Sequence, residues 1–555
     1  MSICTWLSSS LERNYPATQV RKRPALAIDA ALNERFSFQL VVRNEIKLDG
    51  RRNGDAPVDI SVSADAPEGW EIRIRRVGYV PMLHRNTGAI EGETDGIGMI
   101  PGYVPDPLFE ETSMPLPANE THAFWFSVKP STGAKPGKFA ISAILAAAGQ
   151  KEQRRTVKAS LHNVRIAKRR DFHISNWFYN DAVLDFHHCN AFDETYWKLL
   201  PKYLENMSSH GQNMINVPVF TPPLDGVKRP TQLLRVTRKG KDKYQFDWSD
   251  VKRFISSAKK AGFEKFEWVH LFTQWGVKNA LRIYHGQGAD EKLLWPPETE
   301  AVSKTYRNFL SQFLPEFHDF LQSEKLMSSS FFHLSDEPRG EEHLENYRKA
   351  REILRELAPW MKVMDAVSEI KFAKAGLTDM PIPLISAALD FVAEDIPCFC
   401  YYCCGPRGRF LQRLMDTPLA KIRMNGWLFY RWPFQGFLHW GYNYWYQSQT
   451  RNKINPFVVQ DGTKWPRWPY GDCFMVYPGE NGPLDSIRWE VLSESLQDYA
   501  LLQTLGVERK SLSEIHTFED FPKSAEWITK NRKRLLRRAA AATKTRSTKS
   551  EVRNK

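Results

Sequence analysis

The stretch FFHLSDEPRG, residues 331–340, decides the fold prediction, because an apolar run ends there in two adjacent carboxylates and a proline. Asp336 and Glu337 follow the run directly. Pro338 biases Glu337 away from helical geometry, so the chain is expected to stay extended at this point. In a barrel of parallel strands, active residues lie at the carboxyl ends of the strands. The stretch therefore predicts a strand with a candidate site at its exit.

Apolar runs alternate with helical stretches on both sides of this segment, which is the pattern of parallel strands joined by crossover helices. Eight such runs predict a (β/α)8 TIM-type barrel. A doubly wound sheet is the main structural alternative, but the sequence has no glycine-rich phosphate loop to support it. The predicted strands are residues 172–179, 213–220, 265–272, 331–336, 362–367, 389–393, 398–403 and 436–445.

The N-terminal part of the chain has a different pattern. Short apolar runs with partial alternation, separated by Pro, Gly, Asn and Asp, predict an antiparallel β-sandwich. The 555 residues are too many for one hydrophobic core. We therefore expect a multidomain protein of class α/β plus all-β. The predicted parts are an N-terminal sandwich at 1–168, a catalytic barrel at 169–510, and a C-terminal helix with a basic, disordered tail at 511–555.

The net charge of +13 is concentrated at the C-terminus. Residues 530–555 carry 11 Lys and Arg and one acid, which is +10 and leaves 13 − 10 = +3 for the rest of the chain. An excess of +3 gives no reason to expect nucleic-acid binding. The tail either contacts a polyanion or is simply solvated.

Composition also bears on location and cofactors. The chain is 42% hydrophobic and 25% charged, which is typical of globular proteins, and no apolar run is long enough to span a bilayer. The first residues do not resemble a signal peptide, so a cytoplasmic location is predicted. The cysteine cluster at 398–404 lacks a second Cys/His pair at zinc-finger spacing, and His187–His188 lack a third ligand. No metal and no cofactor are expected.

Adjacent carboxylates suit one kind of glycosidic cleavage. Two ionised carboxylates repel each other, so one is expected to keep a proton beside an anion. Retaining glycosidases of the usual kind need carboxyl groups about 5 Å apart across the sugar, which is awkward for neighbours in the chain. Substrate assistance fits Asp336 and Glu337 better, because a 2-acetamido oxygen then acts as the nucleophile. The alternative is that the pair only caps a helix.

Aromatic residues are concentrated at the predicted strand ends, most of all in GFLHWGYNYW, residues 436–445. Sugar rings present apolar C–H faces that suit Trp and Tyr walls. Packing inside the barrel is the alternative for any single aromatic residue. The predicted substrate-binding residues, which include polar neighbours of these aromatics, are Trp177, His333, Tyr401, Tyr402, Trp440, Asn443, Tyr444 and Tyr477.

Four motifs together resemble one known family. They are SDEPRG, CYYCCGP, GFLHWGYNYW and CFMVYPGENGPLDSIRWEVLSESLQDYALL. In order and spacing they resemble glycoside hydrolase family 123 and the related domain-of-unknown-function family 4091. The resemblance implies a retaining, substrate-assisted β-N-acetylgalactosaminidase. Asp336 would orient the acetamide and Glu337 would be the general acid and then the base. A tyrosine should bind the acetamide oxygen, with Tyr402, Tyr444 and Tyr477 as candidates.

Several alternatives stay open from the sequence. Arg488, Glu490 and Asp498 either bind substrate hydroxyls or, as we favour, anchor their helix on the barrel through ion pairs. A carbohydrate is the expected partner, and GalNAc is the favoured sugar. The same fold could act on another sugar, or it could bind glycans without turnover. The intact carboxylate pair argues against the last alternative.

Overall fold

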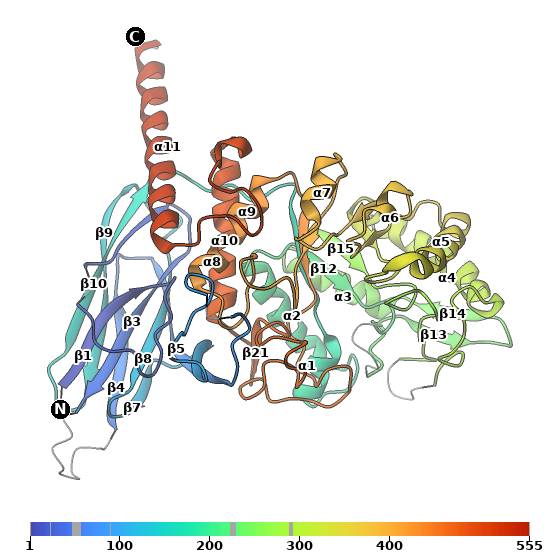
Figure 1. Ribbon diagram of the computed structural model, residues 1–555, viewed down its shortest axis with the longest axis horizontal. Helices are drawn as coiled ribbons and strands as arrows, with labels where there is room; N and C mark the ends of the chain where they lie inside the picture. Colours follow the sequence, from blue (N-terminus) through green and yellow to red (C-terminus); the bar gives the residue numbers. More distant parts are fainter. Residues whose placement is uncertain are drawn as a thin grey trace. The chain divides into compact units, whose positions relative to one another are not determined.

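The computed structural model describes residues 2–22, 24–46, 57–88, 90–222, 229–287 and 292–553 (Figure 1). The chain forms two compact units. Unit 1 is Met1–Arg169, Arg407–Arg431 and Leu484–Lys555, and unit 2 is Arg170–Pro406 and Trp432–Pro483. Residues 407–431 and 484–510, expected in the barrel, thus group with unit 1. Units defined by contacts are not folding domains, so the predicted domain ranges stay a prediction.

Unit 1 contains an all-β region of two five-stranded sheets. Except for the parallel pair β2–β10, their strands pair antiparallel. In order, the first sheet comprises β1 (Ser2–Ser9), β3 (Phe36–Glu45), β8 (Thr121–Lys129), β5 (Glu71–Met82) and β6 (Gly102–Phe109). The second comprises β2 (Ala27–Ala31), β10 (Gln153–His162), β9 (Gly137–Ala147), β4 (Val58–Asp65) and β7 (Ser113–Leu116).

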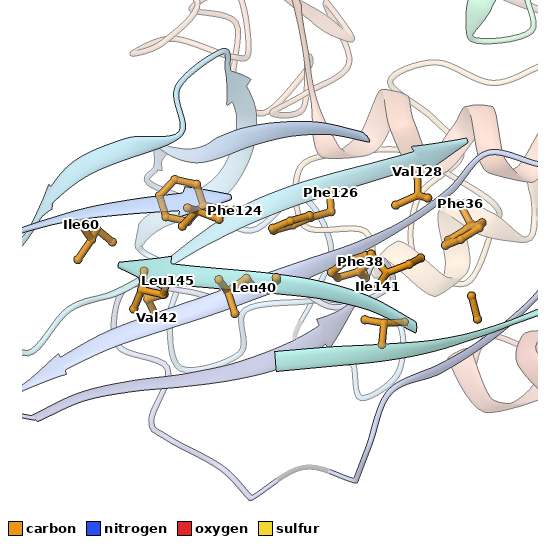
Figure 2. Packing of buried hydrophobic residues seen from close by; sticks show 14 of the residues in the cluster. Phe36, Phe38, Leu40, Val42, Ile60, Phe124, Phe126, Val128, Ile141 and Leu145 are labelled. Atoms are coloured by element: carbon orange, nitrogen blue, oxygen red, sulfur yellow. The ribbon is translucent and has the colours of Figure 1, made fainter. Parts of the chain in front are cut away.

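The two sheets share one apolar core. Along β4, buried and exposed residues alternate, as the period of two in a half-buried strand requires. Phe38 of β3 and Phe126 of β8 stack with ring centroids 4.8 Å apart (Figure 2). Ile141 and Leu145 of β9 belong to the same cluster, so side chains from both sheets fill the space between them.

Helix α10 (Ile487–Thr504) belongs to unit 1 and is almost wholly buried. Ser486 caps it, its side chain accepting a hydrogen bond of 3.1 Å from Trp489 N. The buried Arg488 donates to both oxygens of Asp106 in β6, at 2.9 and 3.0 Å. The expected ion-pair role of this segment therefore agrees with the contacts, but its partners lie on the β-sheet rather than on a barrel.

Glu490 and Asp498 of α10 form further ion pairs within unit 1. Glu490 accepts from the buried Arg75 of β5 at 2.6 Å, and Asp498 from Arg423 at 2.6 and 3.0 Å. Arg423 ends α8 (Leu419–Arg423), which α9 (Asn425–Arg431) follows. The last helix of unit 1, α11 (Ala525–Arg553), continues where the sequence analysis expected a disordered tail.

Unit 2 is an α/β region in which eight strands pair only in parallel. Direct pairings join β11–β20–β19, β12–β15–β16 and β17–β18. Parallel bridges link Phe332 with Val363 and Leu384 with Tyr401. The strands are β11 (His173–Asn176), β12 (Met214–Val217), β15 (Lys265–Trp268), β16 (Ser330–Phe332), β17 (Met364–Asp365), β18 (Met380–Pro381), β19 (Cys400–Tyr401) and β20 (Gly436–His439).

One predicted strand of unit 2 was wrong. Residues 389–393 lie in the helix α7 (Ala388–Ala393), and the strand at this place in the order is β18 instead. Ala388 and Phe391, three residues apart, form the buried face of the helix. Periodicity alone cannot separate helix from strand in so short an apolar run. The other seven predicted segments each overlap a strand that is shorter than expected.

The remaining elements of the α/β region are the helices that connect its strands and two short strand pairs. Ser303 caps α4, its side chain accepting from Tyr306 N at 3.3 Å. The helices are α1 (Asn180–Phe186), α2 (Glu194–Ser209), α3 (Ser249–Lys260), α4 (Lys304–Ser323), α5 (Gly340–Leu357) and α6 (Lys371–Lys374). The strand pairs are β13 (Arg235–Arg238) with β14 (Tyr244–Asp247), and β21 (Val476–Gly479) with β22 (Gly482–Asp485).

The helices of the described part of the chain differ from membrane-spanning helices. None of its helices combines the length and the apolar character that crossing a bilayer requires.

Candidate active site

A cavity of about 420 Å³ lies in unit 2 at the carboxyl ends of the parallel strands. Six strands, β11, β15, β16, β17, β19 and β20, contribute lining residues at their last positions or in the loops that follow. Four tryptophans, three carboxylates and three Lys or Arg side chains are among these residues. The lining consists of Trp177, Trp275, Asp336, Glu337, Arg339, His343, Ala366, Tyr401, Cys403, Cys404, Leu438, Trp440, Ser448, Gln449, Lys464, Arg467, Trp468 and Asp472.

Asp336 and Glu337 both line this cavity although they are neighbours in the chain. In an extended strand, consecutive side chains point to opposite sides. Glu337 has a φ of +44°, in the left-handed region, and this breaks the alternation. The expectation of an extended chain at Glu337 was therefore wrong. A non-glycine residue in this conformation costs about 1–3 kcal/mol and is typical of functional sites.

Two donors hold the carboxylate of Glu337. The hydroxyl of Tyr401 donates to Oε1 at 2.5 Å, and Arg339 Nη2 donates to Oε2 at 3.1 Å. Burial, followed by the charge of Glu337, raises the pKa of Tyr401 well above its usual value, so Tyr401 stays a donor. The Arg339 side chain is 70% exposed, and such an exposed ion pair is weak. Arg339 can therefore leave Glu337 when another group binds.

Trp177 forms part of the cavity wall and is held from behind by a buried carboxylate. Its indole N–H donates to Glu267 Oε1 at 2.5 Å, and Ser175 donates to the other oxygen of Glu267. His333 Nε2 lies 2.7 Å from the same Oε1, and its Nδ1 lies 3.0 Å from Asp365 Oδ1. Because these residues are almost fully buried, the network fixes the orientation of the indole.

The charge of His333 follows from its two carboxylate partners. Burial on its own lowers the pKa of this imidazole, but the hydrogen bonds to Asp365 and Glu267 outweigh burial and raise the pKa to about 10. His270 stacks on His333 with ring centroids 4.4 Å apart. Burial and the neighbouring charge lower the pKa of His270 well below its usual value. The region therefore contains one charged and one neutral imidazole at neutral pH.

Three of these buried residues have the spacing of metal ligands. Ligand atoms of His270, His333 and Asp365 lie within 4.8 Å of one another. However, both ring nitrogens of His333 are within hydrogen-bond distance of a carboxylate. A charged imidazole donates through both nitrogens and has no lone pair for a metal ion. This cluster is thus better described as a histidine held between two carboxylates.

The segment after β20 contributes further aromatic residues to the cavity lining. The Trp440 indole donates to Asp472 Oδ2 at 2.8 Å, and His439 Nε2 lies 3.3 Å from Asp472 Oδ1. Trp468 packs against Trp440 with ring centroids 5.0 Å apart. The two packed indoles give a broad apolar surface of the kind that covers the C–H face of a sugar ring.

The structure brings together some of the predicted site residues. Asp336, Glu337, Trp177, Tyr401 and Trp440 line the cavity. Five other predicted residues lie outside its lining, where each packs or bonds within the protein. These are His333 and Asn443, which bond to buried neighbours, and the buried Tyr402, Tyr444 and Tyr477. Tyr401 is thus the one tyrosine among the lining residues of the described chain.

Sequence reasoning missed the segment that carries Lys464, Arg467, Trp468 and Asp472. Its sequence, DGTKWPRWPYGD at residues 461–472, is rich in Trp, Pro and charge, which is a usable signal for a binding loop. The segment has no periodic pattern, so periodicity does not reveal it. The loops that carry Arg339 and Cys403–Cys404 lie beside predicted residues and could have been found by extending those motifs.

The fold and this site together are those of a glycoside hydrolase. A family model described as "Glycoside hydrolase 123, catalytic domain" matches residues 177–505, which is more than half of the chain. The chain therefore belongs to glycoside hydrolase family 123, and it is a glycosidase. No curated protein sequence matches the chain.

One solved structure has a similar fold, and two others match only weakly. A family 123 glycoside hydrolase from Clostridium perfringens, described for glycolipid glycan hydrolysis, matches with a TM-score of 0.75 at 14% identity, over 98% of this chain and 100% of that chain. A GH5 xyloglucanase from Bacteroides ovatus matches with a TM-score of 0.30 at 10% identity, over 85% of this chain and 98% of that chain. A GH2 β-galacturonidase from Eisenbergiella tayi has a TM-score of 0.32 at 12% identity, over 84% and 69%.

Proposed function

We propose that this glycosidase removes terminal β-linked N-acetylhexosamine, with GalNAc favoured, by a retaining and substrate-assisted mechanism. The observation that carries the proposal is the position of Asp336 and Glu337, adjacent in the chain and lining one cavity. Neighbouring residues do not suit a mechanism that needs carboxyl groups on opposite sides of the sugar. They do suit two neighbouring tasks, one at the acetamide group on C2 and one at the leaving oxygen on C1.

In the first step, Asp336 accepts a hydrogen bond from the acetamide N–H and orients the group. The acetamide oxygen then attacks C1 while Glu337 gives a proton to the leaving oxygen, so the C1–O bond to the leaving group breaks. In the second step, Glu337 takes a proton from the water that attacks C1 and releases the sugar with retained configuration. Arg339 has to leave Glu337 Oε2 for that oxygen to carry the proton, which its exposed position allows.

The aromatic walls bind the sugar ring, and a tyrosine binds the acetamide oxygen. Trp177, Trp440 and Trp468 offer apolar faces to the sugar ring, and Trp177 and Trp440 are each held through the indole N–H by a carboxylate. We propose that Tyr401 is the tyrosine that binds the acetamide oxygen, because Tyr402, Tyr444 and Tyr477 do not line the cavity. The hydroxyl proton of Tyr401 lies on Glu337 Oε1, so this bond has to break when Tyr401 donates to the acetamide oxygen.

We also propose that the eight strands of unit 2 close into a (β/α)8 barrel. The parallel pairings and the two bridges support the order β12–β15–β16–β17–β18–β19–β20–β11. Between the two ends of that order, Ile174 N in β11 donates to the side chain of Asn213, which directly precedes β12. A barrel with consecutive strand order has its active site at the carboxyl ends of the strands, where the cavity lies. The cytoplasmic location and a polyanion contact of the basic tail stay predictions.

The experiment measures turnover of the 4-nitrophenyl β-glycosides of GalNAc, GlcNAc and galactose by the wild type and by Glu337→Gln and Asp336→Asn. We expect the GalNAc compound to be cleaved fastest and the galactoside, which lacks the acetamide, not to be cleaved. Each substitution should lower kcat by about 10²- to 10⁴-fold. Glu345→Gln on the exposed face of α5 makes the same chemical change outside the cavity and should retain activity.

Other outcomes would redirect the proposal. Faster cleavage of the galactoside than of the GalNAc compound would exclude substrate assistance and favour a glycosidase for another sugar. If none of the three compounds is cleaved although GalNAc binds, the chain does not act as an N-acetylhexosaminidase.

A further inference from the structure

The loop of residues 461–468 presents two cations to the cavity. Lys464 and Arg467 both belong to the lining, Lys464 half-buried and Arg467 exposed. The buried Asp461 holds this loop, because its side chain accepts hydrogen bonds from Thr463 N at 3.1 Å and from Trp465 N at 3.2 Å. Hydrogen bonds within the loop therefore fix the backbone that carries the two cations.

Trp468 adds to the order of the same loop. Its backbone N–H and that of Arg467 donate to the Lys464 carbonyl, at 3.2 and 2.9 Å. Gly462 has a φ of +56°, and a Cβ at this position would lie 2.9 Å from the Trp468 ring. The turn thus carries the two cations beside an aromatic wall of the cavity.

Two charged residues of the cavity, Arg339 and Asp472, have polar partners. Arg339 forms an ion pair with Glu337, and Asp472 accepts a hydrogen bond from Trp440 and lies beside His439. Lys464 Nζ forms no ion pair or hydrogen bond with any residue that the structure describes. A neutral sugar has no group that requires an ammonium ion, because aromatic faces and hydroxyl partners suffice for it.

We propose that Lys464 and Arg467 form a subsite for an anionic group of the glycan, a sulfate ester or a carboxylate. This inference rests on the proposed function, because it names the substrate class of the same cavity. Two cations on one ordered loop favour acidic glycans over neutral ones through charge-assisted hydrogen bonds, which are stronger than hydrogen bonds between neutral groups. The preference weakens with added salt, since both side chains are in contact with solvent.

The test compares kcat/KM for 4-nitrophenyl β-GalNAc, for its 6-sulfate, and for a disaccharide of β-GalNAc on glucuronate. The sulfate arm and the carboxylate arm distinguish the two sources of charge. We expect wild type to prefer at least one anionic compound over its neutral counterpart by about tenfold, the size of one charge-assisted hydrogen bond. For the disaccharide, the neutral counterpart is β-GalNAc on glucose. Lys464→Gln and Arg467→Gln should each reduce this ratio.

Lys241→Gln is the matched control, because Lys241 is exposed and lies outside the cavity lining. It removes the same charge, so it should keep the wild-type ratio. The subsite would be overturned if the ratio of kcat/KM for the anionic compound to kcat/KM for its neutral counterpart were the same in wild type, in both loop variants and in the control. A preference for the neutral compounds would also overturn it.

A binding measurement separates this inference from the proposed function. Titration calorimetry with free GalNAc and with GalNAc 6-sulfate compares the two ligands without any need for turnover. Tighter binding of the sulfate that is lost in Lys464→Gln supports the subsite even if no glycoside is cleaved. Cleavage of the neutral glycoside without any anionic preference in rate or binding leaves the proposed function standing and overturns the subsite.

Discussion

The hydroxyl of Tyr401 at the end of β19 donates a hydrogen bond of 2.5 Å to Oε1 of Glu337, which lies in the loop after β16. This bond joins Glu337, in the loop after β16, to the end of β19. It also places a donor on a carboxylate whose backbone is already held in a left-handed conformation. The position of Glu337 therefore depends on contacts that are far apart in the sequence.

Replacement of this tyrosine should impair catalysis rather than folding. Tyr401→Phe removes one hydrogen bond to a charged group, which is worth about 1.5–3 kcal/mol. We expect kcat for the GalNAc glycoside to fall by about 10- to 100-fold. Because its raised pKa keeps Tyr401 protonated, the loss should be the same across the pH range of an ordinary assay. A fall that appears only at alkaline pH would contradict this role.

The charge of His333 should make stability depend on pH. Its folded-state pKa of about 10 lies above the unfolded value of 6.5, so the stabilisation is complete below pH 6.5 and is lost as the pH rises through about 10. Urea unfolding at both ends of this range measures the effect. His333→Asn should have a smaller loss between the two pH values, whereas the exposed His188→Asn should behave as wild type. Equal losses in all three proteins would contradict the assignment.

A glycine behind the cavity wall should not tolerate a side chain. Gly276 has a φ of +120°, and a Cβ there would lie 2.7 Å from His343 Nε2. Gly276→Ala therefore either strains the backbone or displaces Trp275 and His343, at a cost of about 1–3 kcal/mol. We expect a higher KM for the GalNAc glycoside and a lower urea midpoint. Gly240→Ala is the control, since a Cβ there meets no atom within 4 Å.

The ion pair between Arg488 and Asp106 should be essential for the stability of unit 1. Both side chains are fully buried and bond through two parallel contacts. Asp106→Asn leaves a buried guanidinium without its counter-charge, and we expect a loss of about 3–5 kcal/mol in the free energy of unfolding. Asp65→Asn breaks the exposed pair with Arg154 and should cost less than about 1 kcal/mol. Similar losses in the two variants would contradict the importance of burial.

Local pattern was sufficient to predict much of the fold. The apolar runs of the N-terminal region lie in strands, and seven of the eight segments predicted for the α/β region overlap a strand. Periods of two and of 3.6 residues depend on neighbours in the chain, which a sequence displays directly. The run at 389–393 failed because five residues are too few to distinguish the two periods, and α7 buries Ala388 and Phe391 on one helical face.

The sequence by itself also indicated the candidate site, since Asp336 and Glu337 and the aromatic residues after the strands are visible as motifs. Only the tertiary structure decided how they are used. It turned Glu337 to the side of Asp336 by a positive φ, placed Tyr401 rather than its neighbour Tyr402 in the cavity, and added the loop of Lys464. It also anchored α10 on a β-sheet through Arg488. These features depend on contacts between residues that are distant in the chain, and local periodicity carries no information about such contacts.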